Sequence, residues 1–353
     1  MKFDVVKSPQ GADGEETRIW SVDRYVKNPA LSPDGSLLAV VMVEADRFPV
    51  ALQIPLGPSG EPIMGQEREV TLPIEGAVRR VVYSSCGKWL ACEASTEGGD
   101  RDQIWFVTTD PEDEGAYPVD MESHETIELV SWDDDNVAYN AFHRDGNVSG
   151  KLIHPTAKDS RTIDSRIGGA LIHSRDEYSL FRVGSRGNRE LLVIRPDGSW
   201  RPLLPVDNGS TTEQGFVVPG HGEPTFLVRS DHLAEHFRLL KVTHTEHGSS
   251  VDVLLESDDA ELEEFAVSTD GSTLAVLWNV QGWCDLEIYR LTPDGVQLLC
   301  APAMPSLIAT EPSLTADGRF LALGVSGPEF PPSVVLFDVA EQHWVGEDFS
   351  PIA

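Results

Sequence analysis

Short apolar runs alternate with polar turns along almost the whole chain, and one turn pattern returns at a regular spacing. Its clearest copies read Ser-Pro-Asp-Gly, Ser-Thr-Asp-Gly and Thr-Ala-Asp-Gly, each followed by an apolar run with a small residue. Consecutive copies are 43 to 52 residues apart. A period of this length, made only of short strands, is typical of β-propeller blades. The seven turn positions lie near Gly35, Gly87, Asp134, Glu177, Gly222, Gly271 and Gly318.

Each copy contains four predicted strands. Asp-Gly supplies the positive φ that a tight hairpin turn requires between the first and second strands. The second strands are predicted at Leu37–Val43, Trp89–Glu93, Val137–Phe142, Tyr178–Val183, Thr225–Val228, Leu274–Trp278 and Phe320–Val325. The third strands are predicted at Ala51–Leu56, Gln103–Val107, Lys151–His154, Glu190–Ile194, Phe237–Val242, Leu286–Leu291 and Val334–Val339. Several copies end in a weaker fourth strand, as at Glu69–Leu72, Arg201–Leu204, Val251–Leu255 and Val296–Leu299.

This spacing leaves room only for short loops, which excludes a helix in each connection and therefore a parallel α/β fold. Two further Pro-Asp-Gly triplets, at 196–198 and 293–295, are expected to connect third and fourth strands rather than to start extra blades. No composition shift divides the chain. The sequence therefore predicts an all-β fold: a single seven-bladed β-propeller over residues 1–353, with four-stranded antiparallel blades.

Composition narrows the possible partners and the cellular location. The chain has 58 acidic and 27 basic residues and a formal net charge of −31, which disfavours nucleic acid and anionic membrane surfaces as partners. No stretch approaches the roughly 18 consecutive apolar residues of a membrane helix, and residues 1–14 lack the apolar core of a secretory signal. The four cysteines show no C-x-x-C spacing, which indicates free thiols in a cytoplasmic protein and no zinc knuckle.

Two segments carry a family resemblance. One is Phe226–His232 with its continuation Glu235–Leu240, and the other is Val325–Asp338, in which Ser-Gly-Pro and a Pro pair precede the final strand. With the repeated turns, they make the chain from about Asn28 to Asp338 similar to the N-terminal propeller of the prolyl oligopeptidase family of serine peptidases, which includes acylaminoacyl peptidases. The turns also resemble those of TolB-like propellers and WD-like repeats.

The resemblance implies a propeller that filters the access of peptides to an α/β-hydrolase domain. Family members carry a G-x-S-x-G nucleophile elbow in that domain, and this sequence has none. No catalytic residue and no cofactor is therefore carried over. The paired-glutamate helix of dipeptidyl peptidases in the family is also not found, and Glu263 and Glu264 are expected to be solvated before a first strand.

The string His232, Glu235, His236 has the H-x-x-E-H pattern of some zinc enzymes. On a helix the two histidines would share a face and could bind zinc, with the glutamate as general base. Here the string occupies a predicted loop between the second and third strands of the fifth copy, so a metal site is disfavoured.

Other candidates are charged residues near predicted turns and strands. Arg79 and Arg80 lie beside the first strand of the second copy, and either could meet a peptide carboxylate if it pointed into the central channel. An exposed pair matched to nearby carboxylates is the simpler interpretation. Asp133–Asp135 could hold calcium but is interpreted as a solvated turn, and His244 and His247 are expected at the surface.

Three functions remain in competition. The first is a non-catalytic gate for peptide substrates of a hydrolase that this chain does not contain. The second is a free-standing scaffold that binds a protein or peptide on one face. The third is a propeller with its own catalytic site. It ranks last, because no ligand type is seen to recur at equivalent positions of the blades.

Overall fold

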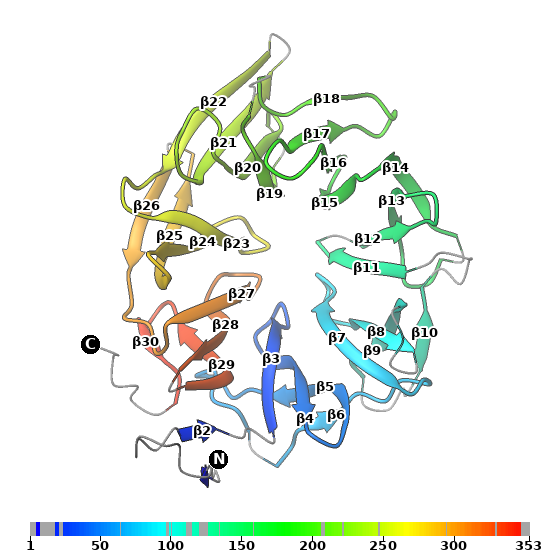
Figure 1. The fold of residues 1–353 in the computed structure, drawn as a ribbon, viewed down its shortest axis with the longest axis vertical. Helices are drawn as coiled ribbons and strands as arrows, with labels where there is room; N and C mark the ends of the chain where they lie inside the picture. Colours follow the sequence, from blue (N-terminus) through cyan, green and yellow to red (C-terminus); the bar gives the residue numbers. More distant parts are fainter. Residues whose placement is uncertain are drawn as a thin grey trace, which may run out of the picture.

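The computed structural model describes residues 5–7, 18–20, 24–63, 65–96, 99, 101–110, 115–119, 126–133, 135–157, 159–205, 209–220, 222–245, 248–293, 295–328 and 330–346. β1 (Val5–Lys7) and β2 (Arg18–Trp20) pair with each other. The remaining strands form seven four-stranded antiparallel sheets, each from four consecutive strands, and the described residues include no helix. The sheets stand around a common axis as the blades of a propeller (Figure 1).

Each blade has one set of consecutive strands. Blade 1 contains β3 (Arg24–Leu31), β4 (Leu37–Glu44), β5 (Arg47–Pro55) and β6 (Arg68–Glu69). Blade 2 contains β7 (Gly76–Tyr83), β8 (Trp89–Thr96), β9 (Asp102–Thr108) and β10 (Ala116–Pro118). Blade 3 contains β11 (Thr126–Ser131), β12 (Val137–Phe142), β13 (Asn147–Ile153) and β14 (Arg161–Ile167). Blade 4 contains β15 (Ala170–Arg175), β16 (Tyr178–Val183), β17 (Glu190–Ile194) and β18 (Trp200–Pro202).

Blade 5 contains β19 (Thr212–Val217), β20 (Thr225–Ser230), β21 (Arg238–Thr245) and β22 (Gly248–Leu255). Blade 6 contains β23 (Glu261–Val267), β24 (Thr273–Val280), β25 (Trp283–Thr292) and β26 (Gly295–Cys300). Blade 7 contains β27 (Ile308–Leu314), β28 (Phe320–Gly327), β29 (Phe330–Asp338) and β30 (His343–Trp344). The first strand of every blade lies next to the axis and is called its inner strand below (Figure 1).

The hydrophobic core is divided among the seven junctions between blades. Each of the seven buried apolar clusters contains residues of two adjacent blades. Successive side chains of a strand point to opposite faces of its sheet. In β4, Ala39 and Val41 therefore pack toward blade 2, whereas Leu38, Val40 and Met42 pack toward blade 7. Every blade buries both faces only when it has two neighbours, so closing the ring stabilises all of them.

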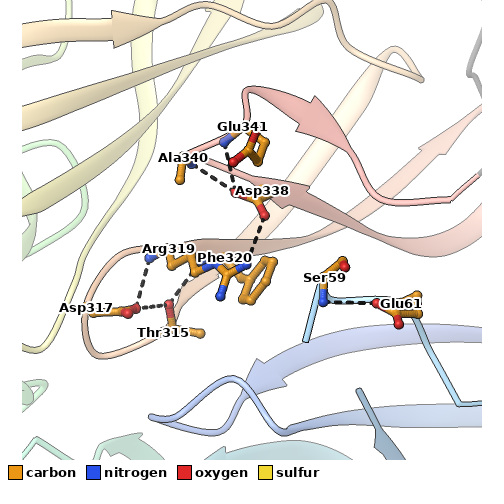
Figure 2. Close-up of polar contacts among 9 residues, drawn as sticks. All are labelled: Ser59, Glu61, Thr315, Asp317, Arg319, Phe320, Asp338, Ala340 and Glu341. Atoms are coloured by element: carbon orange, nitrogen blue, oxygen red, sulfur yellow. Dashed lines mark hydrogen bonds and ion pairs between the residues drawn. The ribbon is translucent and has the colours of Figure 1, made fainter. Parts of the chain in front are cut away.

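The repeated turn is held by its aspartate. In blade 1, Asp34 Oδ1 accepts hydrogen bonds from Ser32 Oγ (2.8 Å) and the Ser36 backbone N–H (3.0 Å), while Ser32 Oγ accepts one from Leu37 N (2.9 Å). Gly35 adopts the positive φ of 70° that the turn needs. Blades 6 and 7 repeat this arrangement, and Figure 2 shows the blade 7 copy with Thr315, Asp317 and Phe320. The recurring sequence is therefore a recurring hydrogen-bond unit.

Blades 1 and 7 close the ring without sharing a sheet. All four strands of blade 1 come from the start of the chain and all four of blade 7 from its end. The junction is held by an apolar cluster that includes Leu38 and Phe320, and by a hydrogen bond from Ala316 N to Pro33 O (2.9 Å). Gly60 approaches Phe320 so closely that a Cβ there would lie 2.8 Å from the ring, so this position requires glycine.

The structure confirms the predicted seven-bladed all-β fold, and both extra Pro-Asp-Gly triplets connect third and fourth strands as expected. The second strands predicted at Val137–Phe142 and Tyr178–Val183 agree with β12 and β16 to the residue. Blade 4 turns at Asp176, which has the positive φ of 54°, one residue before the predicted position. In blade 5 the connection is longer than in blade 1, because β19 ends at Val217 and β20 begins at Thr225. Asp134 lies outside the described residues. Within the described part of the chain, no helix could serve as a membrane span.

Blade 2 offers a test of the turn unit, because Cys86 stands where blades 1, 6 and 7 have aspartate. Ser84 Oγ lies 3.4 Å from Cys86 Sγ and still accepts the Trp89 N–H (3.1 Å). Cys86→Asp supplies the missing acceptor, so we expect it to raise the free energy of unfolding by about 0.5–1 kcal/mol. Urea unfolding monitored by tryptophan fluorescence measures the change. Cys86→Ala is the control, and an aspartate variant no more stable than it would contradict the prediction.

Candidate functional site

Two cavities lie on the axis of the ring. The first, called the turn-face cavity, has a volume of about 500 Å³ and is lined by the inner strands of blades 1, 2, 3, 6 and 7, close to the hairpin turns. The second axial cavity has about 330 Å³ and is lined mainly by inner strands of blades 2 to 6. Arg80, Val130 and Ser131 line both. Both cavities therefore have Arg80 in their walls, and we call the two together the axial channel.

The inner strands cannot pair with another strand on the side that faces the axis. Exposed strand edges leave backbone N–H and C=O groups without strand partners. At every junction, a side chain of one blade bonds the inner-strand backbone of the next; we call these contacts the axial bridges. They are Asn28 Nδ2 to Arg79 O (2.9 Å), Arg80 Nη1 to Leu129 O (2.7 Å), Asn140 Nδ2 to Leu171 O (3.1 Å), Arg182 Nη1 to Glu213 O (3.4 Å), Gln214 Nε2 to Phe265 O (2.7 Å), Glu311 N to Glu264 Oε2 (2.9 Å) and Leu31 N to Ser313 Oγ (3.0 Å).

A β-bulge positions the bridging side chains that lie on inner strands, whereas Asn140 and Arg182 lie on the second strands β12 and β16. Bulges re-aim side chains and interrupt the strand register. All seven inner strands have a register shift near their middle, between Lys27/Ala30, Val78/Arg80, Leu129/Ser131, Leu171/His173, Thr212/Gln214, Leu262/Glu264 and Thr310/Ser313.

The sequence analysis missed a repeated signal at these bulges. Asn28, Arg80, Glu264 and Glu311 each lie seven residues before the turn glycine of their blade. All four line the turn-face cavity. These four residues are not one ligand type, so the expectation that no ligand type recurs in all blades stands; what recurs in these four blades is a polar side chain. The equivalent positions of the other three blades are Ile127, Ala170 and Gly215.

The two predicted arginines lie in different surroundings. Arg79 Nε forms an ion pair with Asp102 Oδ1 (2.7 Å), and its side chain is half exposed. Arg80 lines both axial cavities while it bonds Leu129 O. Because the bulge separates the two neighbours, only Arg80 is placed to meet a molecule in the channel.

Glu93 completes the contact that Arg80 makes. Its Oε2 accepts the Leu129 N–H (2.7 Å), so Leu129 has both backbone groups bonded to side chains of blade 2. Burial raises the pKa of Glu93 to about 7, although the Leu129 hydrogen bond and the charge of Arg80 oppose the rise. Part of this junction therefore titrates near neutral pH.

A partly buried acid–histidine pair also adjoins the channel. Asp133 Oδ2 lies 2.9 Å from His173 Nε2, and His173 Nδ1 accepts the Val217 N–H (3.3 Å). Burial raises the pKa of Asp133, but His173 and Arg175 outweigh this effect and leave it below its usual value. Both ring nitrogens of the histidine are engaged within the protein, so the pair links blades 3, 4 and 5 and leaves no nitrogen for proton transfer to a substrate.

The H-x-x-E-H string lies in the loop between β20 and β21, as predicted. His232 is buried, Glu235 is exposed, and His236 Nδ1 lies 3.4 Å from Glu261 Oε1. The three side chains therefore do not share one environment. Among the described residues, no group of three or more histidines, cysteines or carboxylates is arranged to hold a metal ion.

Three other expectations need correction. Glu264 lies within β23 and is half-buried because it bonds the next blade, whereas Glu263 is exposed. Asp133 is partly buried, with a side chain that is 17% exposed, and it pairs with His173 rather than being solvated. His244 is 3% exposed and accepts a hydrogen bond from Arg201 Nε (2.9 Å). Burial lowers the pKa of His244 to about 4. His247 lies outside the described residues.

The fold is similar to that of several solved prolyl oligopeptidase structures. A prolyl endopeptidase structure, from a study of inter-domain dynamics in catalysis and specificity, matches 93% of this chain with a TM-score of 0.67 and 16% identity. Prolyl oligopeptidase B from Galerina marginata, as apo protein and with a 25mer macrocyclization substrate, matches 90% with TM-scores of 0.65 and 0.66 and identities of 14% and 15%. The chain spans about half the length of these proteins, at 48% and 49%.

These similarities confirm the fold that the resemblance implied, a propeller like that of prolyl oligopeptidases. No protein-family model matches the sequence, and no curated protein matches it either.

The raised pKa of Glu93 predicts a pH-dependent stability. Between its ordinary value of 4.5 and about 7, the folded protein binds more protons than the unfolded chain, so stability falls as the pH rises. Glu93→Gln removes this contribution. From pH 5 to pH 8 the native protein should lose about 2 kcal/mol more unfolding free energy than the variant, as measured by urea unfolding. Glu190→Gln, at an exposed residue, should show the same dependence of stability on pH as the native protein. If Glu93→Gln also showed the native dependence, the raised pKa of Glu93 would be contradicted.

The axial bridge of Asn140 predicts a large loss of stability. Its side chain is 2% exposed and bonds both Leu171 N (2.7 Å) and Leu171 O (3.1 Å). Asn140→Ala leaves both buried groups without these partners, so the free energy of unfolding should fall by about 2–4 kcal/mol. The exposed Asn188→Ala should change it by less than about 0.5 kcal/mol. Thermal and urea unfolding measure both variants. If Asn140→Ala lowered the free energy of unfolding no more than Asn188→Ala does, the bridge would contribute little to stability.

Proposed function

We propose that this chain is a non-catalytic gating propeller, which admits short or unfolded peptides through its axial channel to a hydrolase. The observation that carries the proposal is the channel itself, whose two cavities of about 500 and 330 Å³ have volumes typical of small-ligand sites. A folded domain has a radius of gyration of roughly 10 Å or more and would be excluded. The likeness to the propeller of prolyl oligopeptidases supports the same role.

The proposal assigns no catalysis to the chain. The Asp133–His173 pair has no free ring nitrogen, and the sequence contains no nucleophile elbow. The purified chain should therefore release no product from chromogenic prolyl or N-acyl peptide substrates. Coupled to a hydrolase domain of the prolyl oligopeptidase type, it should permit cleavage of peptides but not of the same sequence within a folded protein. Cleavage by the chain alone would refute this part of the proposal.

Entry into the channel is tested by binding. Labelled unstructured peptides of about 5 and 15 residues should bind the chain, whereas a folded domain of about 100 residues with the same sequence in a surface loop should not. Ser131→Trp adds a large side chain to the walls of both cavities, so it should reduce peptide binding at least about tenfold, measured by fluorescence anisotropy. Ser185→Trp, in an exposed loop, is the matched control.

Circular dichroism and thermal unfolding should first show that both tryptophan variants are folded. Equal peptide binding by native protein and folded Ser131→Trp would place the peptide outside the channel and contradict gating.

The scaffold alternative is favoured by a different observation. A groove of about 960 Å³ lies away from the axis between blades 4, 5 and 6, beside the connection between β19 and β20. Asp176, Glu177 and Glu223 are among its lining residues, which suits a basic peptide. A partner that binds Ser131→Trp normally but loses affinity for Glu177→Lys would support this function over gating.

A further inference from the structure

The turn-face cavity has groups of opposite charge on different sides. Arg80 comes from β7, whereas Glu264 and Glu311 come from β23 and β27. Figure 1 shows β7 facing β23 and β27 across the centre of the ring. A guanidinium therefore lies on one side and two carboxylates on the other. The fourth charged residue of the lining, Asp133, is paired with His173.

The two carboxylates are held together by backbone of unusual conformation. Glu311 has a φ of +57°, which costs a non-glycine residue roughly 1–3 kcal/mol. Its N–H bonds Glu264 Oε2 (2.9 Å), and its own carboxylate accepts the Asn28 N–H. Asn28 also has a positive φ, of 52°. Blades 6, 7 and 1 thus fix the place of both acids at the cavity wall.

A cation close to the two carboxylates would lower their pKa values, which burial raises. Burial raises the pKa of Glu264, and the charge of Glu311 adds to the rise, whereas Arg80 and Arg229 oppose it. Burial also raises the pKa of Glu311, against Arg80 and Lys27. An ammonium group beside the two acids would favour their charged forms in the same way as these basic residues do.

Arg80 is equipped for the opposite group. One of its five N–H groups is donated to Leu129 O, and the side chain is exposed to the channel. A guanidinium binds a carboxylate through charge-assisted hydrogen bonds that are stronger than neutral ones. A short peptide with free ends presents an ammonium and a carboxylate, and about 500 Å³ suits a ligand of this size.

We propose that the turn-face cavity binds short zwitterionic peptides, with the terminal ammonium at Glu264 and Glu311 and the terminal carboxylate at Arg80. This inference rests on the proposed entry of peptides into the channel and adds a preference for free chain ends. Peptides with one blocked end bind more weakly because a charge on the protein is then covered by the ligand without gaining a counterpart.

The native protein tests the proposal first. Trialanine, its N-acetyl form, its C-terminal amide and the doubly blocked peptide are titrated by isothermal calorimetry. Trialanine should bind at least about tenfold more tightly than either singly blocked form, and the doubly blocked form should bind most weakly. Equal affinities for all four would overturn the proposal and leave gating intact, whereas no binding of any peptide, short or long, would count against both.

Variants then assign each end to its residues. Glu264→Gln and Glu311→Gln should abolish the difference in affinity between trialanine and its N-acetyl form. Arg80→Gln should abolish the difference in affinity between trialanine and its C-terminal amide. Glu263→Gln and Arg79→Gln are matched controls, because these neighbours do not line the cavity and should preserve both differences. Discrimination that persists in all three cavity variants would overturn the assignment. If one variant does not fold, the blocked peptides and the remaining variants still decide the question.

Discussion

The inner strand of each blade has an edge with no neighbouring strand, and the rest of the structure depends on how that edge is satisfied. Seven such edges surround one axis, and their backbone groups need partners although no strand pairs with them on that side. Side chains from the preceding blade supply partners at every junction, as Gln214 does for Phe265. These side chains must be polar, and those of Arg80 and Glu264 are also charged, so the contacts that close the ring bring charge to its channel.

Apolar packing and polar contacts have different roles at each junction. The apolar clusters hold adjacent blades face to face and give most of the burial, but they do not fix the register of the inner strands. The axial bridges do, because a hydrogen bond such as that between Asn140 and Leu171 forms in only one alignment. Arg80 and Glu264 hold the structure together and also line a cavity, so stability and any binding at the axis are coupled through the same atoms.

The fold was readable from the sequence because its determinants are local. The turn unit of Ser32, Asp34 and Gly35 lies within a few residues, and the strands that follow alternate or run apolar. The channel was less readable because its contacts join residues far apart in the chain, such as Arg175 and Thr269. Glu264 and Asp133 appeared solvated by type, yet their burial depends on a neighbouring blade. Only alignment of the first strands on their turn glycines would have exposed the recurring polar position.

The closure between blades 1 and 7 has a consequence for the molecule's topology. Six junctions are crossed by the polypeptide and one is not, yet all seven contain an apolar cluster and an axial bridge. Covalent continuity is therefore not what defines the ring. A circular permutant, cut in a loop between two other blades and joined across the present gap, contains the same noncovalent interactions in a different chain order.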